Sequence, residues 1–543
     1  MNGSIRIPTP INEPVLSYAP GTPERASLKA RLAEMAANPV EVPLIISGEE
    51  VRTGDVHEIR APHDHQQVLG TYHSAGPAEV ARAIESSQEA WETWSRMAWV
   101  DRAAVFLRAA DLLAHPRWRD TVNAATMLGQ SKTVHQAEID SACELIDFWR
   151  FNCHFAEKIY ADQPLSAPGM WNRSEYRPLE GFIYAVSPFN FTSIGGNLCG
   201  APALMGNVVL WKPSHTAVLS NYFLMRILVE AGLPAGVVNF IPGDSSRITD
   251  SLLGHPDFAG LHFTGSTGVF QMFWERIGGD IAQYRSYPRI VGETGGKDFI
   301  VAHPSADPDA VRTAMIRGAF EYQGQKCSAA SRAYVPESLW ARMKDSLVEE
   351  TRSIRMGDPT DFRNFMGAVI DEKAFRKLSA YIDRARESED VEILAGGGYD
   401  DSKGWFIEPT LLLAHDPKYE TMCEELFGPV LTIHVYPDDQ WRETLALVDS
   451  TSPYALTGAV FSLDRDAARE AMDALRHAAG NFYVNDKPTG AVVGQQPFGG
   501  SRASGTNDKA GSALNLLRWI SARSMKETFD PPTDYRYPFM NAE

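Results

Sequence analysis

The chain has 543 residues, 44% hydrophobic and 22% charged, which is ordinary for a globular protein with two or more domains. Its 69 acidic and 51 basic residues give a formal charge of −18, which argues against a nucleic-acid or anionic-membrane partner. The five cysteines are widely spaced without a C-x-x-C pair, which argues against a disulfide framework or a zinc site and favours a reducing compartment.

Targeting signals are also lacking in the sequence pattern. No run approaches the roughly 18–20 apolar residues that would cross a bilayer. Residues 1–20 have neither a basic region followed by an apolar core nor the Arg-rich character of a transit peptide. We therefore expect a cytoplasmic protein, or one of the mitochondrial matrix if the source is eukaryotic.

The first third of the chain is predicted to be mostly helical. Residues 1–45 are Pro-rich and then helical in pattern, and we interpret them as an N-terminal arm. A helix is predicted over 76–94, with Pro77 in its first turn, where proline is tolerated. Further helical patterns cover 100–114 and 134–160.

From residue 181 short apolar strands alternate with helices. A helix is predicted from about 217 to 230, ended by Gly232 and Pro234. Strands are predicted at 182–186, 207–211, 237–240 and 261–263. Such alternation predicts a parallel sheet covered on both faces, with ligands at the carboxyl ends of its strands.

A second α/β unit is predicted after Glu293. A helix is predicted over 308–322, and strands at 299–302, 431–435, 457–461 and 481–485. We expect an α/β fold with a Rossmann-type NAD-binding domain (46–160 and 181–293), an α/β catalytic domain (294–510) and a small β oligomerisation flap (161–180 and 511–543). Glu293 would then lie at a domain junction, a usual place for an active site.

Two segments carry the most chemical information. Glu293 lies in the Gly-rich run 292–297, and Cys327 follows Gly-Gln-Lys. Cys327 could attack a carbonyl as a thiolate, activated by a helix start and a neighbouring lysine, and Glu293 could later activate water. Taken alone, a buried structural cysteine and a surface loop glutamate remain alternatives.

Other polar residues follow strand ends. The Asn190 amide could stabilise an oxyanion, or simply form a turn. The strand-to-helix turn at 263–268 could bind a phosphate, although it does not match G-x-G-x-x-G. Lys212 could bind a ribose or be a solvated lysine, and Glu425 lies beside an aromatic residue and a turn.

Together these segments resemble the aldehyde dehydrogenase superfamily over roughly residues 40–530, and they occur in that family's order. The matching segments are the Asn190 segment, 212–214, 263–266, 293–297, 324–327, 425–429 and 497–501. The resemblance implies that Cys327 adds to an aldehyde, with the oxyanion held by Asn190 and the backbone N–H of Cys327. Hydride then passes to NAD, and Glu293 activates the water that hydrolyses the thioester.

The resemblance also implies the binding residues, and no metal is expected. The implied NAD-binding residues are Ser187, Lys212, Gly265, Ser266, Glu425 and Phe427. Within the superfamily the chain most resembles the branch that acts on 1-pyrroline-5-carboxylate, oxidising L-glutamate γ-semialdehyde in proline breakdown. The residues that this branch implies for substrate are Glu144, Phe191, Ser328, Gly490, Ala491 and Phe498.

Two positions depart from many family members. His215 stands where many have a ribose-binding glutamate, so exclusive use of NAD is not assured, and Phe270 stands where many have glycine. The resemblance implies a homodimer or higher homo-oligomer, and leaves open whether a proline dehydrogenase delivers the substrate. Two alternatives stay open: another semialdehyde dehydrogenase, such as one acting on succinate semialdehyde, and a non-catalytic protein of this fold.

Overall fold

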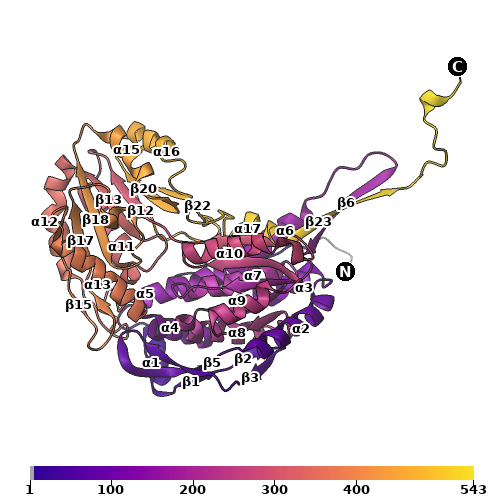
Figure 1. Ribbon diagram of the computed structural model, residues 1–543, viewed down its shortest axis with the longest axis horizontal. Coiled ribbons are helices and arrows are strands. Elements are labelled where there is room, and N and C mark those ends of the chain that lie inside the picture. Colours follow the sequence, from indigo (N-terminus) through magenta and orange to yellow (C-terminus); the bar gives the residue numbers. More distant parts are fainter. Residues whose placement is uncertain (1–4, 543) are drawn as a thin grey trace.

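Two seven-stranded sheets form the cores of two lobes in the computed structural model, which describes residues 5–542 (Figure 1). In the first sheet the order is β11 (Arg289–Glu293), β10 (Phe258–Thr264), β7 (Phe182–Val186), β8 (Val208–Lys212), β9 (Val238–Phe240), β2 (Leu44–Ile46) and β3 (Glu49–Val51). Its first five strands are parallel, and β2 and β3 add to it antiparallel. The predicted buried parallel sheet is therefore confirmed.

Helices cover both faces of this sheet because its strands are apolar on both sides. One face packs on α3 (Trp99–Ala114), α4 (Pro116–Gln130), α6 (Leu145–Ala161), α7 (Thr192–Leu204) and α8 (Val218–Glu230). The other face packs on α2 (Pro77–Trp94), α9 (Ser245–Leu253) and α10 (Thr267–Gly279). Consecutive residues of β7, such as Ile183 and Tyr184, are fully buried in opposite cores.

The second sheet is also parallel, except for one edge strand. Its order is β14 (Val391–Ala395), β17 (Thr410–Ala414), β18 (Val430–Tyr436), β13 (Ala330–Pro336), β12 (Asp298–Ala302), β20 (Thr457–Phe461) and β21 (Asn481–Val484). Only β14 runs antiparallel to its neighbour. Its helices are α11 (Pro308–Phe320), α12 (Glu337–Ser353), α13 (Glu372–Glu387), α14 (Glu420–Cys423), α15 (Trp441–Ser450) and α16 (Arg465–Ala474).

Smaller elements lie at the edges of the two lobes. The N-terminal arm contains α1 (Pro23–Ala37), and β1 (Val40–Val42), β5 (Asp64–His73) and β4 (Val56–Ala61) form a three-stranded sheet. Two-stranded pairs join β15 (Tyr399–Asp400) to β16 (Phe406–Ile407) and β19 (Tyr454–Ala455) to β22 (Ser501–Arg502). Among residues 5–542, no helix combines the length and apolarity needed to span a bilayer.

A long two-stranded antiparallel ribbon projects from the first lobe, and the C-terminal tail continues from it away from the body (Figure 1). It pairs β6 (Met170–Pro178) with β23 (Ile520–Thr528), two segments from nearly opposite ends of the chain. Just before β23, α17 (Ala513–Leu517) and a fully buried Trp519 return to the first lobe. The backbone oxygen of Trp519 accepts a 2.8 Å hydrogen bond from the Asn207 side chain, so the last part of the chain completes the lobe that the first part begins.

Three sequence predictions need correction. The helix predicted over 134–160 is divided into α5 (Val134–Ala137), a π-helical turn η1 (Glu138–Glu144) and α6. Sequence periodicity did not indicate α4, although it is almost entirely buried. The helix predicted to reach residue 322 ends at Phe320, because the backbone of the next turn enters the left-handed region.

Candidate active site

A cavity of about 360 Å³ brings together most of the residues predicted from the sequence. The eight predicted residues that line it are Cys327, Glu293, Glu144, Phe191, Ser328, Gly490, Ala491 and Phe498. They come from both lobes and from segments more than 300 residues apart. The cavity therefore unites a nucleophile, a candidate base and the predicted substrate loop.

Cys327 lies in a turn that leads into β13, and not at the helix start that the sequence predicted. Before it, Tyr322 and Gln323 both have positive φ values, 51° and 54°, which are uncommon for residues with side chains. Two hydrogen bonds from Gln323 Nε2, to the backbone oxygens of Ser131 and Ala368, hold this turn in place. Strained backbone next to a nucleophile is typical of functional sites.

The electrostatics of Cys327 also differ from the prediction. Burial raises the pKa of its thiol well above the ordinary value, and the carboxylates of Asp298 and Glu293 add to the shift. The neighbouring Lys326 does not offset this, because its ammonium pairs with Glu321 at 3.0 Å. The raised pKa favours the thiol form of Cys327, so the predicted attack on a carbonyl would require prior loss of a proton.

Glu293 ends β11, the outermost strand of the first sheet. Burial raises the pKa of its carboxyl group well above the usual range, and Oε2 makes no hydrogen bond with the residues that the structure describes. Neighbouring glycines are needed for space, since a methyl group at Gly499 would lie 2.9 Å from Glu293 Oε1. A half-buried carboxylate with one free oxygen is suited to receive a proton from water.

Asn190 connects the two lobes beside the nucleophile. It follows β7 and is almost fully buried, and its Nδ2 donates a 3.1 Å hydrogen bond to the backbone oxygen of Gln325, two residues before Cys327. Gln325 Oε1 in turn accepts from the backbone N–H of Ile370. The amide is thus held next to the catalytic turn, where its role in oxyanion binding stays a prediction.

A buried polar chain that the sequence did not indicate supports Glu144 and Phe191. Lys132 Nζ, within a fully buried side chain, pairs with Asp140 at 2.7 Å and lies 4.2 Å from the centre of the Phe191 ring. Asp140 accepts hydrogen bonds from the backbone and hydroxyl of Ser193, and Ser193 Oγ also donates to Glu144 Oε2 at 3.0 Å. Lys132 lies just before the helix predicted over 134–160 and Asp140 lies within it, so the sequence pattern gave no signal of this pairing.

Glu144 itself is held in a largely desolvated position. Burial, and then the nearby Asp140 carboxylate, raise the pKa of Glu144 to about 8. It closes the π-helical turn η1, a rare conformation that is often associated with functional sites. The turn shifts the helical register at Glu144 relative to that of a continuous α-helix.

We expect Lys132→Met to destabilise the protein by about 3–5 kcal/mol, because the Asp140 charge would remain buried without its partner. The midpoint of thermal unfolding should fall measurably and reproducibly. Lys373→Met, on the exposed surface of α13, is the matched control and should leave the midpoint nearly unchanged. Equal midpoints for the two variants would show that the buried pair contributes little.

The segment 489–498 provides hydrogen-bond donors to the same cavity. Ser328 Oγ donates to Thr489 Oγ1 at 2.9 Å, which leaves the Thr489 hydroxyl hydrogen for a ligand. Among the hydrogen bonds of residues 5–542, none uses the backbone N–H of Gly490 or Ala491 as donor. Gly490 has a φ of 101°, which favours glycine. These donors fit a carboxylate.

One lysine reinforces this preference for an anion. Lys326 and Lys487 both line the cavity, but Lys326 is paired with Glu321, whereas Lys487 forms no ion pair with any residue in the described range 5–542. Sequence reasoning did not name Thr489 or Lys487 as site residues, although Thr489 begins the predicted loop and Lys487 lies two residues before it. Their proximity in sequence to Gly490 was the available signal.

The predicted cofactor residues do not line this cavity but follow the carboxyl ends of the first sheet's strands. Ser187 follows β7, Lys212 ends β8, and Gly265 and Ser266 follow β10. Ser187 Oγ accepts a 3.0 Å hydrogen bond from Trp211 Nε1, so this hydroxyl group links β7 to β8. Ligands of open parallel sheets bind at this edge.

The second lobe adds the remaining two cofactor candidates. Glu425 Oε1 accepts a 2.9 Å hydrogen bond from the backbone N–H of Gly296, and a methyl group at Gly295 would overlap its carboxylate. Phe427 has a φ of 63° and packs edge-on against Phe189 at 5.8 Å. The junction thus brings residues of both lobes to one edge of the first sheet.

These residues fit a dinucleotide. Burial lowers the pKa of Lys212 to about 8, and its ammonium makes no hydrogen bond within the described part of the chain. Ser266 precedes the 13-residue helix α10 without capping it, so the first N–H groups of that helix are available to a phosphate. Phe270, the departure noted above, stacks on Phe263 with ring centroids 5.5 Å apart, and a methyl group at Gly292 would overlap its ring.

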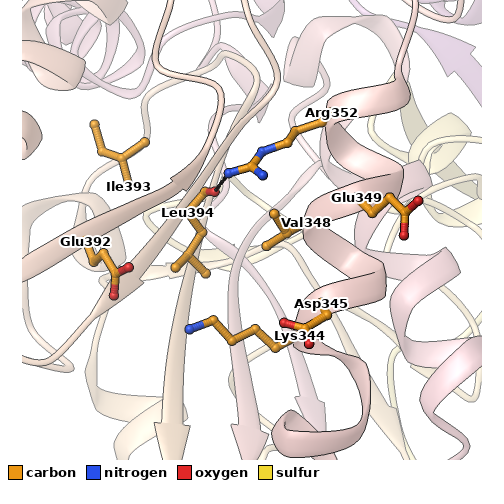
Figure 2. A pocket seen from close by; sticks show the side chains of 8 residues that line it. All are labelled: Lys344, Asp345, Val348, Glu349, Arg352, Glu392, Ile393 and Leu394. Atoms are coloured by element: carbon orange, nitrogen blue, oxygen red, sulfur yellow. Dashed lines mark hydrogen bonds between the residues drawn. The ribbon is translucent and has the colours of Figure 1, made fainter.

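A second concavity, between α12 and β14, has a different character. Figure 2 shows its charged rim, and Arg352 reaches from the helix to donate a 2.9 Å hydrogen bond to the backbone oxygen of Leu394. Its eight lining residues include no cysteine, serine or histidine. It lacks the nucleophile and base that the cavity around Cys327 combines.

Comparisons with known proteins agree with this site. The model of the aldehyde dehydrogenase family matches residues 49–524. The chain is 54% identical over 537 residues to the mitochondrial delta-1-pyrroline-5-carboxylate dehydrogenase of Dictyostelium discoideum, covering 98% of this chain and 96% of that protein. It is similar to the NAD-bound crystal structure of the Mycobacterium tuberculosis delta-pyrroline-5-carboxylate dehydrogenase, with a TM-score of 0.96, 55% identity and full coverage of both chains.

A further similarity concerns a longer protein. The crystal structure of proline utilization A from Bdellovibrio bacteriovorus matches with a TM-score of 0.90 and 29% identity. The match covers 96% of this chain but 53% of that one.

Proposed function

The chain belongs to the aldehyde dehydrogenase family, and we propose that it catalyses the NAD-dependent oxidation of L-glutamate γ-semialdehyde, formed from 1-pyrroline-5-carboxylate, to L-glutamate. One observation carries the proposal most directly: a single cavity joins Cys327 and Glu293 to the donors around Gly490 and Ala491. The first pair performs the chemistry, and the second group binds the end of the substrate that does not react.

The first half-reaction forms and oxidises a covalent adduct. Cys327 Sγ loses its proton and attacks the aldehyde carbon, which gives a thiohemiacetal whose oxyanion the Asn190 amide and the Cys327 N–H stabilise. NAD, when bound, accepts the hydride that leaves the former aldehyde carbon. The carbon is thereby oxidised and remains bound to sulfur as a thioester.

The second half-reaction releases the product. Glu293 takes a proton from a water molecule, and the resulting hydroxide attacks the thioester carbon. The carbon–sulfur bond breaks, so that Cys327 is restored and a carboxylate leaves. The raised pKa of the Glu293 carboxyl group makes its carboxylate a stronger base than that of an exposed glutamate, which favours proton removal from water.

Substrate selection follows from the opposite chemistry of the two substrate ends. Thr489, Gly490 and Ala491 offer donors to the α-carboxylate, and Lys487 attracts it. Phe191 and Phe498 line the same cavity and would contact the aliphatic carbons. An aldehyde without a carboxylate would leave these buried donors unpaired, which disfavours its binding.

The cofactor would be held at the carboxyl edge of the first sheet. Lys212 and Glu425 would bind the two riboses, and Gly265 with Ser266 a phosphate. Position 215, at the start of the 3-10 turn after β8, is a histidine and not a glutamate. The site therefore has no carboxylate at this position that would repel a 2′-phosphate. The relative from Mycobacterium tuberculosis contains NAD, which supports NAD as the cofactor here.

Partners and location are parts of the same proposal. The projecting β6–β23 ribbon supports a homodimer or higher homo-oligomer, because the exposed edges of a two-stranded sheet can pair with strands of another subunit. The similarity to half of proline utilization A supports a functional link to a proline dehydrogenase. A mitochondrial relative supports the matrix as the location in a eukaryote, and the cytoplasm is the equivalent in a bacterium.

We expect NADH formation to be much faster with 1-pyrroline-5-carboxylate than with succinate semialdehyde, which lacks the α-ammonium group. The measurement is the absorbance of NADH with each substrate in parallel, at matched concentrations. A preference for succinate semialdehyde would retain the mechanism but reject the proposed substrate. No reaction with either would reject catalysis altogether.

A further inference from the structure

The N-terminal arm crosses the substrate side of the first lobe as an extended segment. Residues 7–18 form no helix or strand, yet their backbone is fastened at intervals to the helical region 138–161. Ile7 N donates to Glu157 at 2.7 Å, Glu13 N to Asp147 at 2.8 Å and Leu16 N to Glu138 at 2.9 Å. Repeated bonds of this kind define one path for the segment.

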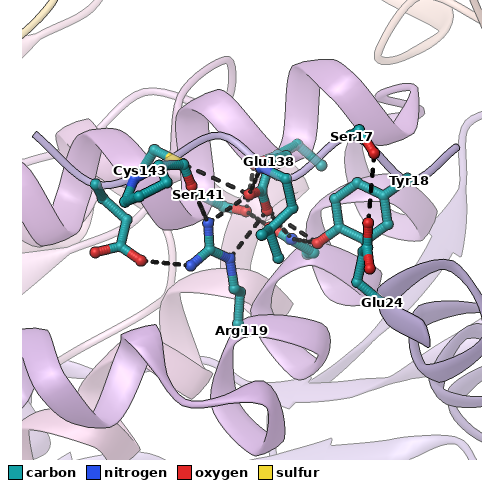
Figure 3. Close-up of polar contacts among 12 residues, drawn as sticks. Ser17, Tyr18, Glu24, Arg119, Glu138, Ser141 and Cys143 are labelled. Atoms are coloured by element: carbon teal, nitrogen blue, oxygen red, sulfur yellow. Dashed lines mark hydrogen bonds and ion pairs between the residues drawn. The ribbon is translucent and has the colours of Figure 1, made fainter. Parts of the chain in front are cut away.

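The strongest of these attachments is a buried ionic cluster, shown in Figure 3. Glu138, which begins the π-helical turn η1, accepts from Tyr18 Oη at 2.9 Å and pairs with Arg119. Arg119 also pairs with Glu13 at 2.6 Å, and Arg150 pairs with Glu13 at 2.7 Å. The arm is therefore locked to the same turn that carries Glu144 at its other end.

Asn12 makes a different connection, because its side chain joins three segments. Its Nδ2 donates to Asp147 Oδ2 and to the backbone oxygen of Val493, both at 2.8 Å. Its Oδ1 accepts from Gln495 Nε2 at 2.9 Å. One amide thus ties helix α6 to the loop whose preceding residues are Gly490 and Ala491.

The arm also forms part of the cavity wall. Asn12, Glu13 and Val15 line the same cavity as Cys327. The substrate loop has no helix or extended strand between residues 485 and 500, and its backbone bonds begin only at the turn 492–496 and the bridge of Phe498 to Ala510, after Gly490 and Ala491. The contacts of Asn12 supply an external constraint on it.

We propose that Asn12 is a positioning residue for the substrate loop, and that the arm segment 7–18 completes the binding site for the α-carboxylate of the substrate. This inference rests on the proposed function. Asn12 acts through Val493 and Gln495, which hold the N–H groups of Gly490 and Ala491 toward the cavity before the substrate arrives. Preorganisation of this kind lowers the ordering cost of binding and leaves the chemical step unchanged.

The test is a comparison of steady-state kinetics for Asn12→Ala and Asn12→Asp with the unmodified protein. Both variants should raise KM for L-glutamate γ-semialdehyde roughly tenfold, which corresponds to about 1.4 kcal/mol. The value of kcat should stay within about twofold and KM for NAD should not change, since the side chain of Asn12 hydrogen-bonds to Asp147, Val493 and Gln495 and to none of the candidate cofactor residues. Asn12→Asp retains the size of the side chain but places a carboxylate against Asp147, so it should be at least as impaired.

The matched control is Asn38→Ala, an exposed asparagine at the end of α1 that bonds only to the backbone oxygen of Glu34. It should leave all three constants unchanged. Gln495→Ala provides a second route if an Asn12 variant does not fold, because Gln495 is exposed and its loss removes one of the three contacts. It should raise the same KM by a smaller factor.

Several outcomes would overturn the inference. An unchanged KM in the folded Asn12 variants, or in Gln495→Ala, would show that the loop holds its position unaided. A parallel fall in kcat and rise in KM for NAD would show a general structural defect. The proposed function is judged separately, by whether the unmodified protein oxidises L-glutamate γ-semialdehyde at all.

Discussion

Cys327→Ala is expected to abolish NADH formation, with a fall in kcat on the order of 10⁶-fold, as for removal of the nucleophile in other covalent enzymes. The physical reason is that the methyl side chain cannot form the bond to the aldehyde carbon, and no other described cysteine except Cys143 lines the cavity. Cys143 is unsuited to replace it, because burial and then Glu138 raise its pKa, and Arg119 contacts its sulfur at 3.4 Å.

Binding of NAD should survive this change, since the cofactor candidates lie at the carboxyl edge of the first sheet. Isothermal titration with NAD measures this directly, alongside the rate of NADH formation. Cys423→Ala, at the partly exposed end of α14, is the matched control and should retain full activity. Substantial oxidation by Cys327→Ala would contradict a covalent mechanism.

Glu293→Gln is expected to separate the two half-reactions. The first turnover should still produce about one NADH per active site, because Cys327 and the cofactor are intact. Later turnovers should be slower by about 10²–10⁴-fold, the usual contribution of a general base. Rapid-mixing absorbance should show this burst, and mass spectrometry of the stalled enzyme should show one acyl group on the chain.

The pH dependence provides an independent readout for the same residue. Burial raises the pKa of Glu293, so the protonated and inactive form persists to higher pH than for an exposed glutamate. Hydrolysis in the unmodified protein should therefore accelerate as pH rises through that pKa, and Glu293→Gln should lose this dependence. Absence of a burst, with both phases slowed together, would instead place Glu293 before the oxidation step.

The architecture was largely predictable because its strands are buried on both faces. Five-residue apolar runs such as 182–186 and 457–461 have few alternatives to a central parallel strand, and they match β7 and β20. The predictions of secondary structure were wrong where tertiary contacts override the helical periodicity of the local sequence. The Glu138 cluster stabilises a π-helical turn inside a helix that its sequence alone would make continuous.

The site was predicted less completely, for an electrostatic reason. Cys327 and Glu293 share a cavity as expected, and their motifs were informative because glycines at 295 and 296 are needed to fit Glu425 and the Cys327 backbone. A pattern cannot show which charges are already neutralised. Lys326 was expected to activate Cys327, but it faces Glu321. The long-range contacts of Lys132 and Asn12 likewise depend on folding of the whole chain.

The return of the chain to its first lobe has a consequence for synthesis on the ribosome. Trp519 completes the core of a lobe whose sheet is contributed by residues 44–293, β23 pairs with β6 beside it, and some 220 residues of the second lobe are translated between residues 293 and 519. The nascent first lobe must therefore wait, with His262 and its neighbours uncovered, until Trp519 has been translated. The two lobes do not mature in the order in which they emerge, and termination just before residue 519 would leave the first lobe incomplete although the second had been fully synthesised.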